Sequence, residues 1–105
     1  MTALPGTWAL TMRTPIGSIH ADMTFTGDDT DMSGTAVGSA ETVDLRDVVT
    51  TPASDGERVT WSQSITKPLR LNLDFDVTVS GDEMHGFSRA GRLPRSAVTG
   101  RRIRG

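Results

Sequence analysis

Three polar residues interrupt strand faces that are otherwise apolar, and they are the first candidates for chemistry. They are Asp47, Gln63 and Ser88, and they share their faces with Leu45, Val49, Trp61 and Met84. A carboxylate in a core is costly unless it is paired, hydrogen-bonded or protonated. A pocketed carboxylate with a raised pKa can also act as a general acid or base, which makes Asp47 the catalytic candidate. The alternative, which we favour, is that all three lie near strand ends and face water.

A second group of candidates is formed by His20, Asp22 and His85. His20 and Asp22 are two residues apart, so they share one face of a strand, and they suit a metal site or an acid–base pair. That face is expected to point outward, so we favour a solvated surface. The sequence has no Gly-rich phosphate loop, no nucleophile turn and no zinc-type ligand cluster. We therefore predict no metal and no cofactor, and we leave open whether the protein is an enzyme.

Strands rather than helices are expected to position these residues. Apolar and polar residues alternate without a fault from 69 to 79, which is typical of a strand with one dry face and one wet face. Similar shorter runs are separated by turn signals. The predicted strands cover about 6–13, 17–26, 31–38, 42–50, 57–65, 69–80, 83–90 and 96–103.

The number and spacing of these strands predict an all-β fold, an eight-stranded antiparallel up-and-down β-barrel that forms a single domain over residues 1–105. A two-sheet β-sandwich is the alternative. The interior of an eight-stranded barrel is either filled by side chains or holds one small ligand. The side chains expected inside are Trp8, Leu10, Met12, Ile19, Met23, Phe25, Leu45, Val59, Trp61, Leu71, Leu73, Phe75, Val77 and Met84.

Composition narrows the possible classes of function. The chain has 105 residues and no cysteine, which excludes a disulfide framework and a thiolate metal site. No apolar run approaches the roughly 18 residues of a membrane span. The first residues also lack the basic region and long apolar stretch of a signal peptide. We therefore predict a cytoplasmic protein with no membrane partner.

Charge is distributed unevenly along the chain, although the net charge is only −2. Residues 84–105 contain six arginines and no acid, whereas all 13 acidic residues lie in 1–83. One interpretation is a tail that binds nucleic acid. We favour instead that the last, basic strands pair with acidic strands on the outer wall. The arginines follow strand alternation, and no aromatic residue after Phe87 is present to stack on bases.

Both ends of the chain carry a further signal. Gly6-Thr7-Trp8 opens the first predicted strand, and Arg101 and Arg102 lie on the last. This pattern resembles the calycin group of barrels (lipocalins, fatty-acid-binding proteins and avidins), which begin with Gly-x-Trp and often cover that Trp with a basic residue of the last strand. The resemblance implies an up-and-down barrel around a small-molecule cavity. It also implies that Trp8 closes the barrel floor, with Arg101 or Arg102 stacked across it by a cation–π contact.

Binding of a small, largely apolar molecule is the function that we expect first. The alternatives are a small cofactor-independent enzyme of isomerase or cyclase type, and an accessory or oligomerisation domain with a filled core. A homodimer is also expected, because association is a common way for small domains to gain stability. The predicted ligand-binding residues are Met12, Met23, Trp61, Gln63, Phe75, Met84 and Ser88, and Asp47 is the predicted catalytic residue of an enzyme.

Overall fold

Antiparallel strands make up most of the chain in a computed structural model that describes residues 4–14, 17–28, 31–38, 41–66 and 70–104. No helix occurs among these residues, so none of them forms a helix that could cross a membrane. The strands are β1 (Gly6–Thr14), β2 (Gly17–Asp28), β3 (Asp31–Val37), β4 (Thr42–Asp44), β5 (Arg46–Ala53), β6 (Gly56–Ile65), β7 (Leu71–Ser80), β8 (Glu83–Ala90) and β9 (Ser96–Arg104).

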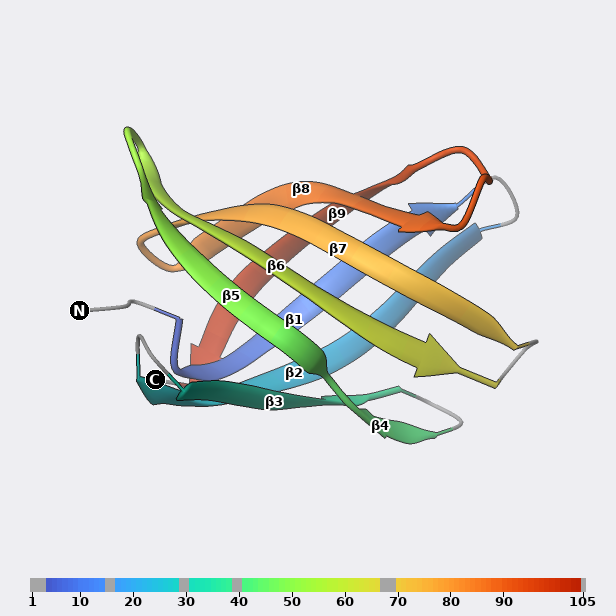
Figure 1. Ribbon diagram of the computed structural model, residues 1–105, viewed down its shortest axis with the longest axis horizontal. Coiled ribbons are helices and arrows are strands. Elements are labelled where there is room, and N and C mark those ends of the chain that lie inside the picture. Colours follow the sequence, from blue (N-terminus) through green and yellow to red (C-terminus); the bar gives the residue numbers. More distant parts are fainter. Residues whose placement is uncertain (1–3, 15–16, 29–30, 39–40, 67–69, 105) are drawn as a thin grey trace.

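These strands form one antiparallel sheet that curves into a nearly closed barrel (Figure 1). The strand order is β4-β3-β2-β1-β9-β8-β7-β6-β5. Most neighbours in the sheet are also neighbours in the sequence, as short antiparallel connections require. The pairing of β1 with β9 brings the first strand against the last. The predicted all-β, antiparallel up-and-down barrel is therefore confirmed.

The two edges of the sheet are brought near each other by the chain itself, where the predicted strand 42–50 divides into β4 and β5. β4 pairs with β3 and β5 pairs with β6, while Leu45 lies between the two strands. The backbone N–H of Leu45 donates to the carbonyl of Gly34 over 2.9 Å. A Cβ at Gly34 would lie only 2.9 Å from Leu45 Cδ1, so the missing side chain leaves room for Leu45. This division gives nine strands in the described residues instead of the predicted eight.

The period-two alternation places the core as predicted. On β7, buried Leu73, Phe75 and Val77 alternate with exposed polar residues. The other predicted interior residues that are buried are Trp8, Leu10, Met23, Phe25, Leu45, Val59, Trp61 and Met84. Met12 and Leu71 are half-buried, whereas Ile19 is 37% exposed. Residue 69, where the predicted sixth strand begins, lies outside the described residues.

One end of the barrel is closed by Trp8 and Arg102. Trp8 has no exposed surface, and its Nε1 donates to the carbonyl of Leu4 over 2.9 Å. The guanidinium carbon of Arg102 lies 4.4 Å from the centroid of the Trp8 ring. Arg102 Nη1 also donates to the carbonyl of Pro5 over 2.6 Å, and its Nε donates to Asp82 Oδ1 over 2.9 Å. The predicted contact between Trp8 and a basic residue of the last strand is therefore confirmed for Arg102.

Arg89 of β8 and Arg101 of β9 lie on the outer wall. Exposed Arg101 is in register with Glu83, and exposed Arg89 is in register with Asp74. This register places basic strands beside acidic ones, as the favoured interpretation of the uneven charge predicts.

Candidate ligand-binding cavity

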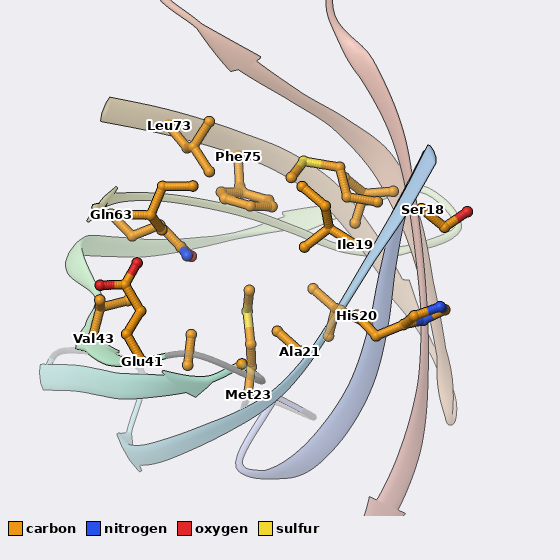
Figure 2. Close-up of a pocket in the computed structure, with 16 residues that line it drawn as sticks. Ser18, Ile19, His20, Ala21, Met23, Glu41, Val43, Gln63, Leu73 and Phe75 are labelled. Atoms are coloured by element: carbon orange, nitrogen blue, oxygen red, sulfur yellow. The ribbon is translucent and has the colours of Figure 1, made fainter. Parts of the chain in front are cut away.

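A cavity of about 450 Å³ lies inside the barrel, toward the end away from Trp8 (Figure 2). β1 illustrates this arrangement, because it carries Trp8 near its start and Met12, which lines the cavity, near its finish. A volume of this size is typical of small-molecule sites. The apolar part of the lining consists of Leu10, Met12, Ile19, Ala21, Met23, Ala36, Val43, Ile65, Leu73, Phe75 and Val98.

Gln63 contributes a polar group to this apolar lining. It follows Trp61 by two residues on β6, so both side chains point to the barrel interior. Gln63 is only 4% exposed, and its Oε1 accepts a hydrogen bond from Trp61 Nε1 over 3.1 Å. This bond fixes which end of the amide is oxygen, because the indole N–H can only donate. The end of the side chain points into the cavity (Figure 2), and no residue in the described part of the chain accepts a hydrogen bond from its Nε2.

The aromatic neighbours of Gln63 hold Trp61 in place. The Trp61 ring stacks on Phe75 with 4.8 Å between centroids and an interplanar angle of 9°. Phe25 meets Trp61 edge-on, with 5.3 Å between centroids. Trp61 is therefore fixed on two sides, and through its N–H it orients the Gln63 amide. The alternation of side chains along β6 thus places the Gln63 amide N–H, already oriented by Trp61, in an apolar wall.

Glu41 contributes a carboxyl group to the same cavity (Figure 2). Glu41 is half-buried, and its Oε1 and Oε2 accept hydrogen bonds from the backbone N–H and the hydroxyl of Thr66, over 2.8 and 2.7 Å. No lysine or arginine belongs to the lining in the described part of the chain. Sequence reasoning missed Glu41, since it lies just before the predicted strand 42–50. Its proximity to β6 follows from barrel closure rather than from a local pattern.

His20, Asp22 and His85 do not form the alternative site. All three are exposed, and His20 lies at the cavity mouth with its ring directed away from the interior (Figure 2). His20 is in register with Thr11 on β1, and His85 is in register with Thr99 on β9, so two strands separate the histidines. No group of three or more histidine, aspartate or glutamate side chains among the described residues could hold a metal ion.

Four of the predicted ligand-binding residues line the cavity: Met12, Met23, Gln63 and Phe75. Trp61 supports the lining from behind through its contacts with Gln63 and Phe75. The binding role of these residues stays a prediction. The structure adds that their side chains converge on one space from four strands, β1, β2, β6 and β7.

Met84 is buried as expected, and Ser88 is buried although the favoured interpretation had it, like Gln63, facing water; neither Met84 nor Ser88 lines the cavity. Met84 is 2% exposed and lies in register with Val79 and Gly100. Its Cγ would be 2.6 Å from a Cβ at Gly100, so it packs tightly against β9. Ser88 is 2% exposed, and its Oγ has no hydrogen-bond partner among the described residues. Neither residue lines this cavity, because strand parity gives the side of the sheet but not the level along the barrel axis, and their binding role stays a prediction.

Asp47 does not face the interior, where a catalytic role inside the barrel would need it. Asp47 is exposed, and its φ of 55° lies in the left-handed region. The register between β5 and β6 shifts between Arg46 and Val49, as at a β-bulge. The extra residue inverts the alternation, so Val49 is 53% exposed although it shares the expected face of Leu45. Asp47 lies on the outer wall, as its alternative assignment to water requires.

An ion pair lies on the same outer wall. Arg58 donates to Asp76 through Nε and Nη2 over 3.0 and 2.6 Å. These hydrogen bonds hold the pKa of Asp76 below its ordinary value and raise the pKa of Arg58. Both side chains are more than half exposed, so the pair is screened by water and salt.

The chain matches no protein-family model, no curated protein and no solved structure.

Proposed function

We propose that this protein binds a small, largely apolar molecule inside its barrel. The observation that carries the proposal is the cavity of about 450 Å³ with its mainly apolar lining. Met12 and Met23 suit such a role, because flexible, polarizable thioethers adapt to irregular ligand shapes. Phe75 supplies a rigid apolar surface that is itself held by stacking on Trp61.

A calycin-like family relationship is part of this proposal. It is supported by the up-and-down barrel and by the contact of Arg102 with Trp8, which both follow the resemblance. In such an arrangement the packed end contributes stability, while the other end is free to bind. A cytoplasmic location is proposed as well, because a chain without cysteine is compatible with reducing conditions.

The alternative function, a small isomerase or cyclase, now needs an acid–base residue other than Asp47. Asp47 is on the outer wall, so an acid–base group inside the barrel would be Glu41. The alternative of an accessory domain with a filled core is less favoured, because the lining retains a volume that larger side chains could occupy. A homodimer stays a proposal, and sedimentation at micromolar concentration would distinguish it from the 11.3 kDa monomer.

The test compares two alanine substitutions. Ala21 lines the cavity, whereas Ala97 is exposed on β9, so Ala21→Phe fills the cavity and Ala97→Phe adds the same ring outside. Native mass spectrometry of protein taken directly from cells should show a bound small molecule on wild type and Ala97→Phe, but not on Ala21→Phe. Wild-type protein without any bound molecule, or equal retention by both variants, would contradict the proposal.

A further inference from the structure

Gln63 has a donor that the described protein does not use. Its Oε1 is engaged by Trp61 Nε1, and the residue is 4% exposed in an otherwise apolar wall. No described residue accepts a hydrogen bond from Nε2, which faces the cavity rather than bulk solvent. This N–H is available to an occupant of the cavity, so an occupant that brings an acceptor is favoured over one that does not.

We propose that the ligand is a neutral, mainly apolar molecule with a carbonyl-type oxygen that accepts a hydrogen bond from Gln63 Nε2. This inference rests on the proposed function and names the chemical class that the site selects. The hydrocarbon part of the ligand lies against Met12, Met23 and Phe75, which line the same cavity from β1, β2 and β7.

The charge of the cavity argues for a neutral ligand. Glu41 places a carboxyl group in the same space, and no lysine or arginine of the described residues lines it. An ionised fatty acid would therefore place its carboxylate beside that of Glu41, and two carboxylates in one site repel each other. This distinguishes the cavity from one built for anionic lipids.

The hydrogen-bonding geometry argues for a carbonyl rather than an alcohol. Nε2 can only donate, so the ligand atom beside it must accept. A carbonyl oxygen meets that need without adding a donor of its own. An alcohol would add a hydroxyl proton that needs an acceptor of its own, which is a further demand on the site that a ketone does not make.

The test uses four naphthalene probes that differ at one position. All carry a 2-dimethylamino group, and position 6 holds a propionyl ketone, the corresponding secondary alcohol, a propyl chain or a carboxylate. Titrations measure the dissociation constant of each probe for wild type, Gln63→Met and Met12→Leu. Met12→Leu is the matched control, because it changes an apolar lining residue at nearly constant volume and leaves the donor in place.

We expect Gln63→Met to weaken the ketone about fivefold to tenfold relative to the propyl probe, as the loss of one hydrogen bond predicts. Met12→Leu should leave that ratio unchanged, and the carboxylate should bind most weakly to wild type. The infrared carbonyl frequency of the ¹³C-labelled ketone should be lower when bound to wild type than in hydrocarbon solvent. This frequency needs no variant, so the inference stays testable if Gln63→Met does not fold.

Three results would overturn the inference. They are a ketone-to-propyl ratio that Gln63→Met leaves unchanged, an unshifted carbonyl frequency, and tighter binding of the alcohol or the carboxylate than of the ketone. In each of these cases binding itself persists, so the proposed function stands. Failure of all four probes to bind, or binding that Ala21→Phe does not reduce, would instead contradict the proposed function.

Discussion

Arg102 offers a sharp test of how the closed end is held together. Its guanidinium lies over the Trp8 ring, donates to the Pro5 carbonyl and pairs with Asp82, while its side chain is only 16% exposed. Arg102→Ala removes a shielded cation–π contact of about 1–2 kcal/mol. It also removes a hydrogen bond from a charged donor, worth about 1–2 kcal/mol. The pair with Asp82 adds less than about 1 kcal/mol, because that carboxylate is 79% exposed.

We therefore expect Arg102→Ala to lower the free energy of unfolding by about 3 kcal/mol. The neighbouring Arg101 gives the matched control, since it carries the same charge on the exposed face of the same strand. Arg101→Ala should change the free energy of unfolding by less than about 0.5 kcal/mol. Arg102→Lys should fall between the two, because an ammonium group lacks the planar fork that reaches the ring, Pro5 and Asp82 together.

The assay is urea unfolding followed by far-ultraviolet circular dichroism and by tryptophan fluorescence. Comparable slopes with urea for all variants would indicate that only the stability differs, and not the extent of unfolding. Equal losses from Arg101→Ala and Arg102→Ala would refute the reasoning. The stability would then depend on charge at the last strand rather than on the contacts at Trp8.

Three further predictions concern residues outside the cavity. Ser88→Ala should raise the free energy of unfolding by about 1 kcal/mol in urea unfolding, because it removes a buried hydroxyl without a partner among the described residues; a loss of stability would indicate that the hydroxyl is bonded. Asp47→Gly should raise the urea midpoint or leave it unchanged, whereas Asp47→Val should lower it, since φ is 55° there; equal effects would contradict a left-handed residue. The lowered pKa of Asp76 means that its contribution is present above the ordinary aspartate pKa and is lost as the pH falls through the lowered value. Acid titrations of stability should therefore be flatter for Asp76→Asn than for wild type in that range, and parallel curves would show that the pair with Arg58 contributes nothing.

The fold could be predicted because its signal is local. Side chains on a strand alternate between two faces, so a faultless run such as that on β7 identifies both the strand and its buried side. The contact of Trp8 with the last strand was accessible through the resemblance at the two chain ends, and the register of β1 with β9 confirms it for Arg102.

The candidate site was only partly accessible, for two physical reasons. A bulge depends on backbone conformation at one residue, and the left-handed turn at Asp47 inverted the parity of everything after it on β5. Strand alternation also shows which face of the sheet a side chain occupies, but not its position along the barrel axis. It therefore could not distinguish Gln63, which reaches the cavity, from Ser88, which does not. The position of Glu41 at the cavity depends on how the part of the chain near β3 approaches β6. This is a long-range property that no local sequence pattern predicts.

The distribution of side-chain sizes links stability to the proposed role. The closed end is packed with Trp8 and Met84, and the middle of the barrel with stacked Trp61. The cavity wall includes Ala21 and Ala36, where a leucine or phenylalanine could fill space. A chain selected only for a filled core would gain apolar burial from such changes, since each additional buried methylene is favourable when there is room for it. The small residues are therefore understandable if the hollow serves an occupant, and the cost of keeping it open is offset when that occupant binds.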